Sequence, residues 1–167
     1  MGVDIDWTTQ GAVGPVQNQG SMGTPVPMVA ADAMSAITKI RDGTFRLIDY
    51  RTLTDCAGNS SSYHSYYDLA IKNGKYIVYS GINYNYVAKQ CSGPFKISGE
   101  FNISDCTQLT ASIQLGPTAA AVDATNWATY KSGILSNCGT SPNHSVLVVG
   151  MTDTYWKIKN SWGTAWG

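Results

Sequence analysis

Charged side chains are scarce in this chain. Only 13% of its 167 residues are Asp, Glu, Lys or Arg, and 11 acidic and 11 basic residues cancel to a formal net charge of zero. A nucleic-acid-binding surface needs a concentration of basic side chains, and a site for highly charged ligands needs an excess of one sign. The composition therefore argues against both kinds of partner, and we expect no binding to nucleic acid.

Long apolar runs, internal repeats and low-complexity tracts are also missing. A membrane-spanning helix needs about 20 mostly apolar residues, so we expect no membrane span. A chain of this length can bury a core and normally forms one domain. We also expect no cofactor and no metal.

Apolar periodicity predicts helices early in the chain and strands towards its end. Residues 26–41 form the clearest candidate, because apolar residues recur at intervals of three and four and define one face: Val29, Ala33, Ile37 and Ile40. Proline at the start of this helix is tolerated, because the first N–H groups lack intrahelical partners. Shorter helices are predicted over residues 65–72 and 106–115, and strands over residues 118–122, 145–149 and 155–159.

Four segments carry motifs in a fixed order. Residues 18–28 read Asn-Gln-Gly-Ser-Met-Gly-Thr-Pro-Val-Pro-Met. This segment resembles the active-site entry of papain-like cysteine proteases, which reads Asn-Gln-Gly-Ser-Cys-Gly-Ser-Cys-Trp-Ala-Phe. Residues 7–19 are similar to the family's mature amino terminus, residues 143–150 to its histidine segment and residues 156–167 to its asparagine segment. The order and spacing also agree, with shortening in the middle.

The resemblance implies an α+β fold with two lobes. We predict a single papain-like domain over residues 1–167, with a mainly helical lobe and an N-terminal crossover over about residues 1–105. A β-barrel-like lobe is expected over about residues 106–167. Family members usually continue for another strand or more, so we interpret the chain as truncated at its C-terminus. An open sheet edge there would attract a protein partner.

The position that matches the family's catalytic cysteine holds Pro25. Proline offers no nucleophilic atom and no N–H for the oxyanion. The resemblance matches Gln19 with the other oxyanion donor, His144 with the base and Asn160 with the residue that orients the base. We interpret these three as vestigial and predict that the chain is not an enzyme but a pseudoprotease acting as a binding or structural protein.

Two alternatives stay open. A hydroxyl beside the site, from Ser21 or Thr24, could support weak or unconventional hydrolysis. The chain could also be a decoy that captures protease inhibitors or substrates. If residues are counted evenly from Cys56, Tyr66 falls where the family has a groove glycine, and its side chain would fill the groove. Trp162 matches the tryptophan that shields the family's His–Asn pair.

The chain has four cysteines, which allow three pairings. The resemblance implies a Cys56–Cys91 disulfide and leaves Cys106–Cys138 as the second candidate pair, although Cys138 could instead match a cysteine whose partner lies beyond the chain. Disulfides indicate an oxidising compartment, so we expect an extracellular, lysosomal, vacuolar or other secretory location. Four reduced thiols in a cytosolic protein are the alternative, since no signal peptide precedes the mature-like region.

Two glycosylation sequons add weak support for secretion. They begin at Asn59, in Asn-Ser-Ser, and at Asn102, in Asn-Ile-Ser. Asn143 opens a third match, but we expect that segment to be buried around the histidine.

Overall fold

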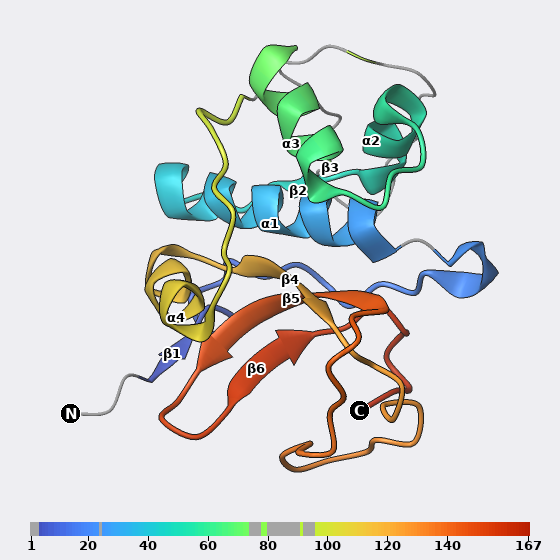
Figure 1. Ribbon diagram of the computed structural model, residues 1–167. Coiled ribbons are helices and arrows are strands. Elements are labelled where there is room, and N and C mark those ends of the chain that lie inside the picture. Colours follow the sequence, from blue (N-terminus) through green and yellow to red (C-terminus); the bar gives the residue numbers. More distant parts are fainter. Residues whose placement is uncertain (1–3, 24, 74–77, 80–90, 92–95) are drawn as a thin grey trace.

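The helices from the first half of the chain lie on one side of the molecule, and a four-stranded sheet with one later helix beside it lies on the other (Figure 1). The computed structural model describes residues 4–23, 25–73, 78–79, 91 and 96–167. The longest helix, α1 (Pro25–Asp42), follows the short 3-10 helix η1 (Gly20–Met22) and runs between two layers. Helices α2 (Tyr50–Ala57) and α3 (Tyr63–Lys72) pack on one side of α1 and the sheet packs on the other. This arrangement confirms the predicted α+β class.

Strand β5 (His144–Met151) is the centre of the sheet and is buried along its whole length. It pairs antiparallel with β4 (Thr118–Val122), with β6 (Trp156–Lys159) and, near its end, with β1 (Ile5–Asp6). Because side chains alternate along a strand, the residues of β5 serve two cores. Leu147 and Val149 face α1, whereas Val148 packs with Ile113 of α4 (Cys106–Leu115). A separate two-stranded sheet joins β2 (Leu47–Ile48) and β3 (Val78–Tyr79).

Helix α1 is buried more completely at its N-terminal end than its periodicity suggests. Val29 and Ala33 of the predicted apolar face are buried against the sheet, but Ile37 and Ile40 are exposed. The opposite face of α1 is buried as well, by contact with α2 and α3. A helix covered from two sides carries no single apolar stripe, so the predicted face was only half right.

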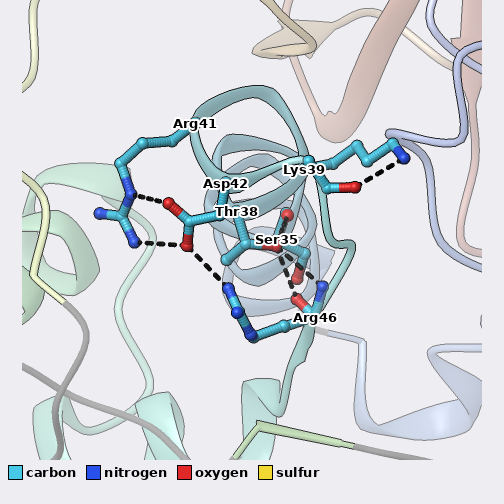
Figure 2. Close-up of polar contacts among 7 residues, drawn as sticks. Ser35, Thr38, Lys39, Arg41, Asp42 and Arg46 are labelled. Carbon is cyan, nitrogen blue, oxygen red and sulfur yellow. Dashed lines mark hydrogen bonds and ion pairs between the residues drawn. The ribbon is translucent and has the colours of Figure 1, made fainter.

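The C-terminal end of α1 is tied to the following turn by side chains (Figure 2). The carboxylate of Asp42 accepts hydrogen bonds from Arg41 Nε at 2.7 Å and from Arg46 Nη1 at 2.7 Å. These two guanidinium groups lower the pKa of Asp42 to about 2. The backbone N–H of Arg46 donates to Thr38 Oγ1 at 2.8 Å, so the turn is fixed in place as it leads into β2.

One disulfide is present, between Cys56 at the end of α2 and Cys91, with the two Cα atoms 5.7 Å apart. The predicted Cys106–Cys138 pair is wrong, because both cysteines are free and exposed. Cys106 begins α4, whereas Cys138 belongs to the long loop between β4 and β5, and Figure 1 shows these segments at opposite ends of the sheet. A disulfide needs its two cysteines close together, with Cα atoms within about 7 Å, whereas these two cysteines belong to segments that lie apart.

Across the described residues, none of the helices has the length and apolar character required to cross a bilayer. The same residues include no group of three or more His, Cys, Asp or Glu side chains arranged to hold a metal ion.

Candidate functional site

A cavity of about 400 Å³ opens between the N-terminus of α1 and the first residues of β5. We call it the cleft cavity. One wall comes from the helical side, namely the start of α1 and the loop before α3, and the other comes from β4 and β5. The lining residues are Gly23, Pro25, Val26, Asn59, Ser60, Ser61, Ala121, Pro142, Asn143, His144 and Ser145.

The sheet-side wall holds a buried pair formed by His144 and Asn160. His144 Nε2 lies 2.7 Å from Asn160 Oδ1. An amide oxygen can only accept a hydrogen bond, so Nε2 carries a proton, and in a neutral imidazole Nδ1 is then the nitrogen with the lone pair. Asn160 Oδ1 also accepts from the backbone N–H of Ser161 at 2.8 Å, which fixes the amide and therefore the tautomer. His144 thus presents a base at the wall of the cleft cavity.

Gln19 is held beside this pair by a short antiparallel contact between the two ends of the chain. Its backbone N–H donates to the carbonyl of Ser161 at 2.8 Å, and Ser161 Oγ donates to Gln19 Oε1 at 2.6 Å. Asn18 forms a backbone bridge with Trp162 in the same contact. The side-chain oxygen of Gln19 is therefore engaged, which leaves its Nε2 group as the donor. Gln19 itself does not line the cleft cavity.

A cluster of aromatic rings covers the His–Asn pair from outside. The ring of Trp162 lies 4.9 Å from that of His144, measured between centroids. Trp166 packs edge-on against Trp162 at 5.3 Å and stacks on Trp127 at 6.4 Å. These rings keep water away from one side of the hydrogen bond, and such exclusion strengthens electrostatic contacts. Trp162 therefore lies next to the histidine, but it is not among the residues that line the cleft cavity, where a groove role was also predicted for it.

Tyr66 does not lie in the groove, and that prediction is wrong. Its side chain is fully buried in the helical core, 0% exposed. Helix α3 begins at Tyr63, so Tyr66 falls on the inward face of its first turn, and even counting from Cys56 gave a false register. Ser60 and Ser61 stand in the cavity wall instead. Tyr66 supports that wall from behind, because its hydroxyl accepts from Ser60 N at 2.8 Å.

A buried ion pair joins the helical side to the sheet beside the site. Lys159 Nζ, from β6, lies 2.6 Å from Asp32 Oδ2 of α1, and the two side chains are 5% and 7% exposed. Asp32 Oδ1 also accepts from Gln17 Nε2 at 3.1 Å. Burial raises the pKa of Asp32, against the opposing attraction of Lys159. Sequence reasoning missed this pair, although a lone acid in an apolar helix and a lone lysine directly before Asn160 were visible signals.

The remaining candidate site residues do not gather at one place in the fold. Ser21 is exposed in η1 and does not line the cleft cavity, and Thr24 lies outside the described residues. His64 is exposed and contacts Glu100 away from the cavity wall. Asn59 lies at the cavity, whereas Asn102 lines a second cavity of about 720 Å³ between α1 and α4.

Comparison with known proteins agrees with this geometry. The family model described as "Papain family cysteine protease" matches residues 1–167. Cathepsin L 1 of Paramecium tetraurelia is 34% identical over 183 residues, covering 99% of this chain and 57% of that protein. Macrodontain-1 of Ananas macrodontes is 33% identical, covering 98% of this chain and 84% of that protein.

Solved structures give the same result. A bromelain protease from Ananas comosus in complex with the E64 inhibitor superposes with a TM-score of 0.78 at 31% identity, covering 98% of this chain and 85% of that one. A Carica candamarcensis cysteine protease, also in complex with E-64, gives 0.80 at 31% identity, covering 98% of this chain and 84% of that one. The chain belongs to the papain family of cysteine proteases, and it spans 57% of the length of the Paramecium relative.

These findings contradict the prediction that the chain is not an enzyme. It belongs to a peptidase family, and the relatives that match nearly its whole length are named as cathepsins, bromelain and caricain. The prediction inferred from the single residue Pro25 that the whole chain is not an enzyme. Pro25 lacks a thiol and an N–H, but it leaves the fold, the cavity and the His–Asn pair in place.

Proposed function

We propose that this chain binds extended peptides in the cleft cavity and hydrolyses their amide bonds slowly, with water as the nucleophile. The observation that carries the proposal is the buried His144–Asn160 pair, joined at 2.7 Å, at the wall of a cavity of about 400 Å³. We choose peptides as the substrates because the family model and two of the matching relatives carry names that describe cysteine proteases. The proposal assigns each neighbouring residue a task.

In this scheme His144 is the general base. Asn160 holds the proton on Nε2, so Nδ1 takes a proton from a water molecule as the water oxygen attacks the peptide carbonyl carbon. The C–N bond then breaks, and the proton passes from His144 to the leaving amine. We assign the oxyanion donor to Gln19 Nε2, which requires the peptide carbonyl to lie at the edge of the cavity next to Gln19, whose side chain is held by Ser161. Trp162 limits the access of other water to the pair.

The rate should be low for two separate reasons. The loss of one oxyanion donor costs about 10²–10³ in rate, and proline has no N–H to supply at residue 25. Proteases that have lost their nucleophile still accelerate the reaction, but only by about 10³–10⁴-fold over the reaction in water. We therefore expect turnover at least roughly 10³-fold below that of a relative with a cysteine nucleophile.

The test is peptide cleavage by the purified chain, followed with a fluorogenic peptide library. Slow cleavage should persist in His64→Ala, because His64 lies away from the cavity wall, and should disappear in His144→Ala. Asn160→Ala should reduce it by weakening the orientation of the base. Binding of an uncleaved peptide, read by fluorescence polarisation, measures the cleft separately. Cleavage that survives His144→Ala, or no cleavage at all, would contradict the proposed mechanism.

We also propose that the protein functions in an oxidising compartment, outside the cell or in a lysosome or vacuole. The Cys56–Cys91 disulfide supports this location. Production in a reducing cytosol should leave Cys56 and Cys91 as thiols that react with an alkylating reagent after denaturation. If both thiols resisted alkylation under those conditions, the inference from the disulfide to the compartment would fail.

A second candidate function is contact with a protein partner at the edge of the sheet. Within the described residues, β6 pairs only with β5, and Tyr155 and Trp156 beside that edge are 44% and 37% exposed. Edge strands with exposed aromatic residues favour pairing with another chain. Size-exclusion chromatography with light scattering should show self-association that Trp156→Lys weakens. A monomer at high concentration would count against this edge.

A further inference from the structure

The loop that forms the helical-side wall carries a modification sequon at the mouth of the cleft cavity. Asn59, Ser60 and Ser61 all line the cavity together with Pro25 and His144. Asn59 and Ser61 are exposed, and residue 60 is not proline. The triplet therefore satisfies the Asn-x-Ser requirement at a point where the side chain of Asn59 is accessible.

The fold around Asn59 tolerates an attached group. The loop is fixed from the inside by Tyr66, whose hydroxyl accepts from Ser60 N and donates towards the carbonyls of Gly58 at 3.1 Å and Ser60 at 3.2 Å. No hydrogen bond of the Asn59 side chain occurs within the described part of the chain, so replacing one amide hydrogen by a sugar breaks no contact there.

The other sequon at the cleft is different. Both side-chain atoms of Asn143 are engaged, because Oδ1 accepts from Ala124 N at 2.9 Å and Nδ2 donates to Thr125 Oγ1 at 3.0 Å. Ser145, the hydroxyl residue of that triplet, is buried on β5. A glycan at Asn143 would require these contacts to break, whereas Asn59 has no such obstacle.

We propose that Asn59 carries an N-linked glycan that covers the cleft cavity and limits entry of peptides. In the attachment step, Asn59 Nδ2 bonds to C1 of an oligosaccharide carried on a lipid pyrophosphate. The amide loses one proton, and the lipid pyrophosphate leaves. Such donors act in the secretory pathway, where the Cys56–Cys91 disulfide also forms. A branched oligosaccharide at the rim of a cavity of about 400 Å³ is bulky enough to obstruct it. The effect on peptide entry rests on the proposed function.

The experiment compares the chain secreted from cultured eukaryotic cells with Asn59→Gln and Ser61→Ala, which remove the same sequon in two ways. Intact mass before and after glycosidase treatment should show one glycan that both variants lack. Peptide affinity by fluorescence polarisation should rise about tenfold or more when this glycan is absent, since a covered cavity cannot bury its ligand. Asn102→Gln is the matched control, because it removes an exposed sequon that lines the other cavity.

The outcomes separate the two proposals. An unmodified Asn59 in the secreted protein overturns the inference about the glycan and leaves the proposed function standing. A modified Asn59 with unchanged peptide affinity overturns the covering of the cleft. If neither the modified nor the unmodified protein binds peptides, the proposed function fails, and the covering effect fails with it.

Discussion

The two walls of the cleft cavity are built by different means. On the sheet side, His144 at the start of β5 and Asn160 directly after β6 are buried, hydrogen-bonded to each other and flanked by Trp162. On the helical side, Pro25 and the loop at residues 58–62 present their groups near solvent, and the loop is fastened inward through Tyr66. The base half of the site is therefore held by contacts that do not depend on residue 25. The difference explains how the proposed base, His144, can stay in place with a proline at residue 25.

The largest expected effect on stability comes from Lys159→Met, which removes one partner of the buried pair that joins α1 to the sheet-side wall. Breaking a buried pair costs about 3–5 kcal/mol, because the carboxyl of Asp32 stays buried without the lysine that compensates its charge. The matched control is Lys157→Met on the same strand. Lys157 also lies 2.6 Å from a carboxylate, that of Asp6, but the two side chains are 46% and 27% exposed. We expect this control to cost less than about 1 kcal/mol.

Urea unfolding measures both losses. Equal losses for Lys159→Met and Lys157→Met would show that burial of the first pair does not matter for stability. Adding Asp32→Leu to Lys159→Met should restore most of the loss, since a buried pair can be replaced by apolar side chains of similar size at little cost.

The helical-side wall should lose about 0.5–1.5 kcal/mol of stability in Tyr66→Phe. This change removes a hydroxyl of a buried side chain that bonds to the backbone of Gly58 and Ser60, so the loop loses its attachment to the helical core. Tyr67→Phe on the same helix is the control, because no hydrogen bond of the Tyr67 hydroxyl occurs among the described residues. The Tm of thermal unfolding and the peptide affinity should both be lower for Tyr66→Phe than for the wild type. If Tyr67→Phe were equally damaging, the support of the wall by Tyr66 would be refuted.

The smallest expected effect lies at the far end of α1, where Asp42→Asn removes the acceptor of two arginines. The folded pKa of Asp42, about 2, lies below its ordinary value of 3.8. The contribution of Asp42 is therefore present above the ordinary pKa and is lost as pH falls through about 2. The Tm difference between wild type and Asp42→Asn should be small at neutral pH, shrink as the pH falls towards 2 and vanish below it, with peptide cleavage at neutral pH unchanged. A difference that does not shrink between neutral pH and pH 2 would contradict this assignment.

The sequence predicted those elements whose ends are marked chemically. Helix α4 was predicted with its observed bounds, since Gly116 and Pro117 mark its end, and the structure shows that Asp105 caps its start. Strand β4 also matched, and β5 and β6 were found within a few residues. Helix α2 was missed, although Asp49 caps it, and the two-residue strands β1 and β2 are too short for a periodic signal.

The site was harder to predict than the fold, because its support is tertiary. Gln19, His144 and Asn160 were recognisable from motifs, but the role of Ser161 in holding Gln19 depends on a contact across 142 positions. The same holds for Asp32 and Lys159, which are 127 positions apart. Tyr66 was misplaced because counting along the chain cannot show where α3 begins. The prediction of a Cys106–Cys138 disulfide failed for a similar reason. It paired the two cysteines that remained after Cys56 and Cys91, without regard to the distance between them in the fold.

The central claim is that the cleft is complete except for the nucleophile at residue 25. Pro25→Cys tests it most directly, because it supplies a thiol and an N–H together at the first residue of α1, where a helix N-terminus favours the thiolate. Peptide cleavage by this variant should exceed that of the wild type by roughly 10³-fold or more, and the gain should disappear in Pro25→Cys combined with His144→Ala. A correctly folded Pro25→Cys protein with no gain in cleavage would contradict the account.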